Sequence, residues 1–366
     1  MFKKVLSILL VGMMLFSSMI VSKAEIASLQ PSETVTDFAQ KNIGFLLNNL
    51  KSDPEAFGMT GIDFDNLTLS KPIIPYDADN NYATIKDLVY YPVLENNKIV
   101  AIYSVTKSKN GTLTATLGRD FADEINNFIS SNNEKFSLVI SSDGLHIINN
   151  LETAKLEHNN KHKNGHLKID IKNAPKEIMT SEIKSDYKAN IDSSTKGAML
   201  RGTLPDKYTI HVPVVRQYND NVCWAACAAS VGQYWTNIRK TARQVCDILG
   251  ISYSRGGTLS NTEDALEDIY DINAGVNKRS HYEGQEVSEV IHDEGKPIIA
   301  GFKGDGKLGH MVVVCGYRIY SSGKTLTIMD PNYSYYRTST YNDDEGDYTI
   351  VVDGHVFEWL GQCYIK

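Results

Sequence analysis

The chain has little cysteine and no excess of positive charge. Only five of its 366 residues are Cys, which excludes a disulfide-stapled scaffold, and the odd number leaves at least one thiol unpaired. Its 37 Lys and Arg stand against 44 Asp and Glu, a formal net charge of −7, so the basic surface of a nucleic-acid-binding protein is not expected. Apolar residues make up 42% and charged residues 22%, a composition that excludes a disordered chain, a collagen and a coiled-coil rod.

Long apolar runs are also missing, except near the first residue. There a positively charged start precedes an apolar run at 5–21, and Ser22 and Ala24 provide small residues for a cleavage site. This pattern is typical of a secretory signal peptide, residues 1–24, and predicts a secreted, extracellular protein. The alternative is a retained membrane anchor, but the run is short for a span of about 20 residues. We expect the mature chain not to be embedded in a membrane.

Composition divides the rest of the chain into two parts. All five Cys and all three Trp lie after residue 220. Residues 180–204 carry little apolar periodicity and much Ser, Thr, Lys and Gly, which predicts an exposed linker. We therefore expect an N-terminal domain over 25–204 and a second domain over 205–366.

The N-terminal domain shows helix and strand patterns but no catalytic motif. Apolar residues spaced three and four apart predict a helix at 35–50. Strand patterns around turn-like clusters predict hairpins at 88–105 and 136–148. A further strand at 113–117 and a helix at 121–129 complete an expected α+β domain.

Two polar clusters raise the question of metal binding. His158, His162 and His166 lie close together, but no acidic residue or Cys shares their spacing. The acidic run at 343–347 lacks the spacing of an EF-hand, although calcium binding there is left open. Both clusters are better explained as solvated loops, and we expect no metal or cofactor.

The most informative segment is 212–235, VPVVRQYNDNVCWAACAASVGQYW. A short strand pattern leads through a polar loop, with Asn221 as the expected N-cap, into an Ala-rich helix beginning at Cys223. Because the helix dipole and unpaired N–H groups favour negative charge there, the thiolate is favoured over the thiol. A thiolate is the nucleophile of cysteine-based acyl transfer. Cys227, one turn later, is expected to face the packing interface.

His310 is the expected base for this nucleophile. It opens a buried strand pattern at 311–317, a position that holds its ring rigidly. A second strand pattern at 326–329 ends in Asp330, and pairing of the two strands would place this carboxylate near His310. An acid there holds the imidazole by its other nitrogen.

Gln217 supplies a possible oxyanion-hole donor. It lies six residues before Cys223, so its side-chain amide and the Cys223 N–H can form a two-donor site. Further helix patterns at 260–269 and 286–293 precede several strand patterns. Helices followed by an antiparallel sheet predict an α+β domain.

Taken together, these motifs resemble those of papain-like cysteine peptidases, in the family's chain order. The resemblance is to the compact bacterial types, the bacteriocin-leader-processing (peptidase C39-like) and staphopain-like peptidases, because an Asp stands where papain has Asn. It covers 205–366 and implies a papain-like fold, with N-terminal helices packed on an antiparallel sheet. The residues that carry it are Gln217, Cys223, Trp224, Ala225, Gly309, His310 and Asp330.

The resemblance implies a secreted cysteine endopeptidase made as a zymogen, acting on protein or peptide substrates as a monomer. Residues 25–204 would then be an α+β propeptide that inhibits the site until the linker is cut at 195–204. The alternatives are a transglutaminase-like acyl transferase or amidase, and a catalytically inactive secreted binding protein on the same fold. The sequence leaves open which of the remaining cysteines pair: Cys227, Cys246, Cys315 and Cys363.

Overall fold

The computed structural model describes residues 31–131, 135–142, 144–150, 153–156, 174–175, 178–179, 183–189, 204–218, 220–304, 309–320, 323–341 and 348–366. The expected signal peptide, most of the linker, the three loop histidines and the acidic run at 343–347 lie outside these residues. Among the described helices, none has the length and apolar character needed to cross a bilayer.

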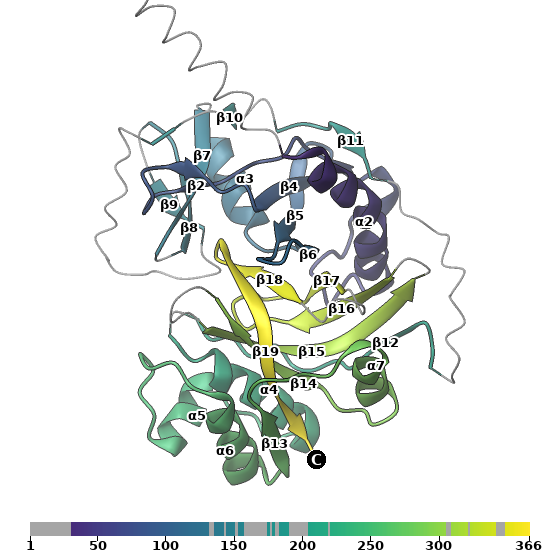
Figure 1. Ribbon diagram of the computed structural model, residues 1–366, viewed down its shortest axis with the longest axis vertical. Helices are drawn as coiled ribbons and strands as arrows, with labels where there is room; N and C mark the ends of the chain where they lie inside the picture. Colours follow the sequence, from purple (N-terminus) through teal and green to yellow (C-terminus); the bar gives the residue numbers. More distant parts are fainter. Residues whose placement is uncertain are drawn as a thin grey trace, which may run out of the picture.

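The N-terminal half combines a long helix with mostly antiparallel strands (Figure 1). The helices expected at 35–50 and 121–129 and both expected hairpins are confirmed. The elements are α2 (Glu33–Ser52), η1 (Phe64–Asn66), β1 (Thr68–Leu69), β2 (Tyr76–Asp77), β3 (Ala83–Thr84), β4 (Leu88–Glu95), β5 (Lys98–Lys107), β6 (Leu113–Gly118), α3 (Ala122–Ser131), β7 (Lys135–Ser141), β8 (Gly144–Ile148), β9 (Thr153–Lys155), β10 (Ile178–Met179) and β11 (Tyr187–Lys188).

The C-terminal half places its first helices on a largely antiparallel sheet, as expected. The elements are β12 (Lys207–Thr209), α4 (Cys223–Thr236), α5 (Ala242–Leu249), α6 (Leu259–Tyr270), β13 (Ala274–Asn277), α7 (Gly284–His292), β14 (Ile298–Lys303), β15 (Gly309–Tyr320), β16 (Gly323–Met329), β17 (Arg337–Tyr341), β18 (Thr349–Val352) and β19 (His355–Ile365). The sequence patterns did not predict α5 or β17. Helix α6 begins one residue earlier than expected and is capped by Thr258, whose side chain accepts from the Asn261 N–H.

One sheet runs through both halves of the chain. Its strand order is β11-β1-β4-β5-β6-β17-β16-β15-β14-β19-β13, with β12 added on β15 and β18 on β19. The two halves meet where β6 pairs antiparallel with β17, at Leu117 opposite Thr338 and Thr116 opposite Ser339. The long strands β15 and β16 lie next to this junction, in the middle of Figure 1. The two parts expected from composition are therefore joined by backbone hydrogen bonds.

The hydrophobic core also crosses the junction. Leu46 and Leu50 of α2 belong to the same cluster of buried side chains as Leu326 of β16. A second cluster, built around Phe136 of β7, includes Val351 of β18. Each half thus buries apolar surface against the other, which stabilises the junction through the hydrophobic effect.

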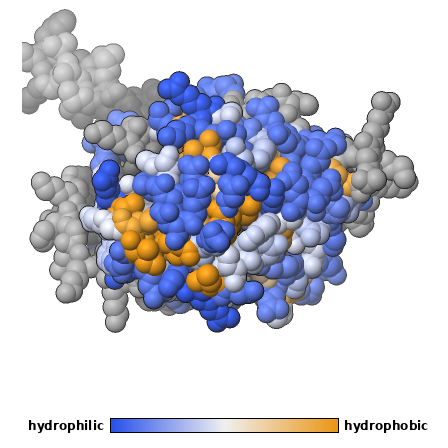
Figure 2. Space-filling model, turned by 90° about the horizontal axis from the view of Figure 1, so that it is seen from below, coloured by the Kyte–Doolittle hydropathy of each residue, from blue (hydrophilic) through white to orange (hydrophobic). Residues whose placement is uncertain are grey.

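Figure 2 views the molecule from the end at which α5, α6 and β13 lie in Figure 1. Most of this face is hydrophilic, and hydrophobic side chains gather mainly toward the side of α5. Ile248 of α5 is 53% exposed. Exposed apolar side chains are common on folded proteins and imply no site by themselves.

A buried asparagine fastens α2 to the sheet. The Asn49 amide nitrogen donates to the hydroxyls of Thr325 in β16, at 2.6 Å, and Thr338 in β17, at 2.7 Å. The Tyr320 hydroxyl donates to the Asn49 amide oxygen at 2.9 Å. Because Asn49 is 5% exposed, removing its amide would cost several buried hydrogen bonds at once.

We expect Asn49→Ala to lower the free energy of unfolding by about 2–3 kcal/mol, since the three hydroxyls lose buried hydrogen bonds. Urea denaturation measures this change. Asn42→Ala is the matched control, because the Asn42 amide donates only within α2, to the Phe38 carbonyl, and a change below about 0.5 kcal/mol is expected there. Equal effects of the two substitutions would contradict the assigned role of Asn49.

Candidate active site

Cys223 is the first residue of α4, as expected from the sequence. The N-cap is Val222, which makes no side-chain capping bond, so the prediction of Asn221 as N-cap is wrong. The side-chain amide of Asn221 instead donates to the Ser254 carbonyl at 3.0 Å, and the backbone N–H of Asn221 donates to the Tyr253 carbonyl at 2.9 Å. The helix start is thus anchored to a loop while no side chain caps its first N–H groups, which favours negative charge at Cys223.

The rest of α4 is locked into the core. Trp224 is fully buried, and a Cβ at Gly257 would lie 2.4 Å from its indole ring, so only glycine lets that loop pass so closely. Cys227 is also fully buried, and its Sγ donates to the Met311 carbonyl at 3.3 Å. Burial raises the pKa of the Cys227 thiol well above its usual range. Cys227 is therefore a core residue, as predicted, while Cys223 is partly exposed.

His310 and Asp330 meet across neighbouring strands. His310 is the second residue of β15, and Asp330 directly follows β16. The antiparallel register of the two strands, with Val313 opposite Met329, brings the side chains together. The His310 Nε2 lies 2.8 Å from Asp330 Oδ1, which also accepts from the Asn332 N–H at 3.0 Å. The predicted contact between these two residues is therefore present.

The surroundings of His310 favour its charged form. Burial alone would lower the pKa of this imidazole, but the charge and hydrogen bond of Asp330 outweigh it, with a further contribution from Cys223, and raise the pKa to about 10. Burial alone would likewise raise the pKa of Asp330, but His310 and Arg337 outweigh it and hold the pKa below its usual range. Because Asp330 engages Nε2, Nδ1 is the ring nitrogen left for Cys223.

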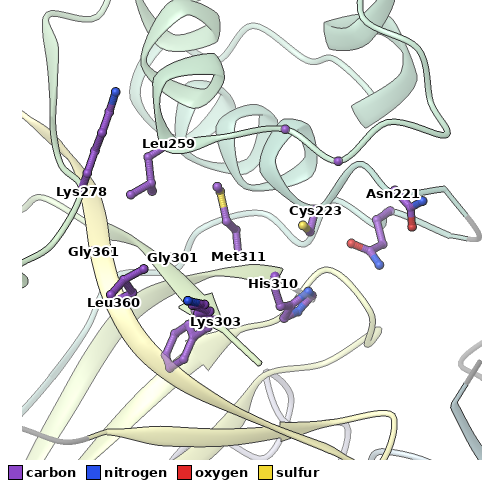
Figure 3. Close-up of a pocket in the computed structure, with 15 residues that line it drawn as sticks. Asn221, Cys223, Leu259, Lys278, Gly301, Lys303, His310, Met311, Leu360 and Gly361 are labelled. Carbon is purple, nitrogen blue, oxygen red and sulfur yellow. The ribbon is translucent and has the colours of Figure 1, made fainter. Parts of the chain in front are cut away.

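A cleft of about 560 Å³ opens over these groups. Figure 3 shows Cys223 entering it from the helix side and His310 from the sheet side. Leu259 and Leu360 lie along the cleft farther from Cys223 and His310, and Met311 lies between. All the described residues that line the cleft fall within 217–361.

Gln217 lines the same cleft, as the sequence predicts. Its backbone N–H donates to Pro331 O at 3.0 Å, and its side-chain nitrogen donates to the Asn332 amide oxygen. An amide nitrogen carries two hydrogens, so one N–H remains for a ligand in the cleft. The loop after Asp330 thus positions Gln217 and supports Asp330 at the same time.

Arg337 is a site residue that the sequence analysis missed. Its Nη1 donates to Asp330 Oδ2 at 3.3 Å and to Val351 O at 2.9 Å. Its Nη2 donates to Asp120 Oδ2 at 3.1 Å, and the guanidinium lies over the Tyr333 ring, 4.4 Å from its centre. The sequence signal that could have found it is an arginine seven residues after Asp330. That signal is weak because the arginine opens a polar segment, RTSTY, which does not resemble a buried strand.

The other chemically interesting side chains lie elsewhere. His281 stacks on Trp359 with ring centres 4.6 Å apart, and His211 is exposed, 3.6 Å from Asp53. Among the residues that the structure describes, no group of three or more His, Cys, Asp or Glu is arranged to hold a metal ion. The cysteines whose pairing the sequence left open are all free thiols.

Comparison with known proteins gives one family match, in the C-terminal half. Residues 209–353 match the model of the Peptidase_C39 like family, and no curated protein matches the chain. The match confirms, over these residues, the resemblance to papain-like cysteine peptidases of C39 type and supports a cysteine peptidase.

Solved structures offer only a distant likeness. One such structure comes from work on antibody cross reactivity between the mite allergens Blo t 1 and Der p 1. It is 11% identical to this chain, with a TM-score of 0.31, and the match covers 44% of this chain and 73% of that chain. Another is digestive procathepsin L 3 of Tenebrio molitor larval midgut, with 12% identity, a TM-score of 0.30, and coverage of 44% and 71%. Such values are too low to support a conclusion about this chain.

We expect Asp330→Asn to lower the pKa of His310 from about 10 toward the ordinary value near 6.5, because the imidazolium loses its adjacent negative charge. A histidine titration followed by NMR measures this shift. Asp293→Asn is the control: it makes the same change beside another histidine, His292, and should leave the His310 titration unchanged. A His310 pKa that stays near 10 in Asp330→Asn would contradict the assignment.

Proposed function

We propose that the chain is a secreted cysteine endopeptidase in which Cys223 is the nucleophile and His310 the acid–base group. The observation that carries this proposal is the buried His310–Asp330 pair, which faces the cleft where Cys223 begins α4. Asp330 orients the imidazole and stabilises its charged form. The match of residues 209–353 to the Peptidase_C39 like family supports the same reaction class.

Catalysis begins from a thiolate–imidazolium pair. The Cys223 thiolate attacks the carbonyl carbon of the scissile peptide, and the carbonyl oxygen becomes an oxyanion. The Cys223 N–H and the free N–H of the Gln217 amide donate to this oxyanion. Imidazolium His310 then protonates the departing amine, the C–N bond breaks, and a thioester to Cys223 remains.

Water completes the cycle. Neutral His310 accepts a proton from a water molecule, whose oxygen attacks the thioester carbonyl. Collapse of the second tetrahedral intermediate breaks the C–S bond, releases the carboxylic acid product and restores the thiolate beside imidazolium His310. The proton given to the amine in the first half is thus replaced in the second, and no co-reactant beyond water is needed.

The cleft suits an extended peptide or protein segment. Leu259, Met311 and Leu360 offer an apolar surface for one substrate side chain, while Lys278 and Lys303 add positive charge. Secretion rests on the apolar run at 5–21, which lies outside the described residues. The removal of 25–204 as a propeptide is a separate prediction from the sequence, and the reaction above does not depend on it.

We expect Cys223→Ala to abolish cleavage of fluorescently labelled casein, since no thiolate remains to attack the peptide. Cys227→Ala is the matched control, because it deletes a buried thiol one turn along the same helix and should keep activity within a few fold. Residual casein cleavage by purified Cys223→Ala would refute the proposal. Amine incorporation without chain cleavage by the wild type would favour the transglutaminase-like alternative.

We expect Gln217→Ala to lower kcat by about 10²–10³ with little change in KM, the usual effect of deleting one oxyanion donor. Steady-state kinetics on a peptide substrate separates the two constants. Gln217→Glu should be at least as slow, since a carboxylate repels the oxyanion. Gln233→Ala, at the far end of α4, is the control and should resemble the wild type; a Gln217→Ala enzyme with unchanged kcat would exclude this role.

A further inference from the structure

A row of buried charged side chains leads from the N-terminal half to the proposed catalytic histidine. The pairing of β6 with β17 places Gly118 and the residues after it beside Arg337. Arg337 Nε lies 3.0 Å from Asp120 Oδ1 and Nη1 lies 3.3 Å from Asp330 Oδ2. Asp330 in turn holds His310 at 2.8 Å. Charges alternate along the row from Asp120 through Arg337 and Asp330 to His310.

All four side chains are removed from solvent. Asp120, Arg337, Asp330 and His310 are 2%, 3%, 0% and 5% exposed. In such surroundings water screens little, so the charge of each group is felt strongly by its neighbours. Burial alone would lower the pKa of Arg337, but Asp120 and the other acidic neighbours outweigh this and raise it.

The chain makes room for the contact between Asp120 and Arg337. A Cβ at Gly118 would lie 2.6 Å from Asp120 Oδ1 and 2.9 Å from Arg337 Cγ. Asp120 itself has a φ of +37°, a conformation that side-chain-bearing residues rarely adopt. The absence of a Cβ at Gly118 and the positive φ of Asp120 together allow the Asp120 carboxylate to reach Arg337.

We propose that Asp120 is a positioning residue of the peptidase site, and that the active enzyme therefore contains the N-terminal half. The proposal rests on the function proposed above. Asp120 neutralises Arg337, so that Asp330 keeps its interaction with His310. Without Asp120, Asp330 would be the remaining carboxylate on the Arg337 guanidinium, and its hold on the imidazolium would weaken.

The N-terminal half also has the contacts of a permanent partner. It supplies β6 to the shared sheet and α2 to the shared core. The described residues of 31–189 do not line the cleft, so their presence leaves the cleft between Cys223 and His310 open. A propeptide that must leave before catalysis would instead expose the edge of β17 and leave Arg337 without Asp120.

The first experiment compares Asp120→Asn with Asp123→Asn in the full chain. Asp123 is the exposed second residue of α3 and pairs with the half-buried Arg119. Both substitutions therefore remove one negative charge from the same region, but only the first touches Arg337. The charged and titratable groups around the His310–Asp330 pair that bear on the measurement are Cys223, Cys227, Arg216, Tyr333, Arg337 and Asp120.

For Asp120→Asn we expect the alkaline limb of the kcat/KM profile to move to lower pH by on the order of one unit, because an added net positive charge disfavours the imidazolium. We expect kcat to fall about tenfold with KM unchanged. Asp123→Asn should match the wild type. The double variant Asp120→Asn with Arg337→Gln restores the charge balance and should return the limb toward the wild-type pH. An Asp120→Asn profile that coincides with that of Asp123→Asn overturns the proposal.

The second experiment does not depend on folding of a variant. Wild-type enzyme is labelled at Cys223 with a thiol-directed epoxide, purified without denaturant, and analysed by gel filtration and mass spectrometry. We expect the species that the epoxide labels, and thereby inactivates, to contain residues of 31–189 together with the C-terminal half, whether or not the linker has been cut. A labelled species that begins near residue 204, from a preparation that was fully active before labelling, overturns the proposal while leaving the peptidase assignment intact. Casein cleavage by Cys223→Ala would instead overturn the assignment itself.

Discussion

The buried contact between His310 and Asp330 is the interaction on which the rest of the site depends. Taking a carboxylate and an imidazolium out of water costs several kcal/mol per charge. Here that cost is offset by the 2.8 Å contact between the two groups, by the Asn332 N–H and by Arg337. The net result is a histidine whose pKa is raised to about 10, so that it stays charged at a higher pH than an ordinary histidine. An ion pair of this kind persists only if the strands that carry it cannot slide.

The continuous sheet supplies that constraint. His310 and Asp330 lie on the neighbouring strands β15 and β16, and β17 follows with Arg337 as its first residue. Strand β6 of the N-terminal half covers the far edge of β17, and α2 packs across both. A one-residue slip anywhere in this series would turn the buried side chains to the opposite face. The N-terminal half therefore contributes to the geometry of a site whose cleft its described residues do not line.

The sequence pointed to most of the side chains that meet at the candidate site because each has a local signal. Cys223 stands where a polar loop changes to an Ala-rich helix, and His310 opens a run of valines. Asp330 closes the next apolar run, so a simple hairpin argument brought it to His310. The prediction of the N-cap failed because a contact distant in sequence competed with a local signal. Asn221 is a good capping residue by type, but its amide is used by Ser254, and the helix begins after Val222.

Residue types, their order and short-range periodicity thus determined the proposed nucleophile, base and carboxylate and the order of helices before strands. These features depend on interactions within one or two turns of helix or one strand, which neighbouring residues specify. Only the tertiary structure decided that Asp120 reaches Arg337 across 217 positions of sequence and that the two halves share a sheet. Strand pairing over such distances is set by which edges and apolar faces meet when the whole chain folds, and no local pattern records that choice.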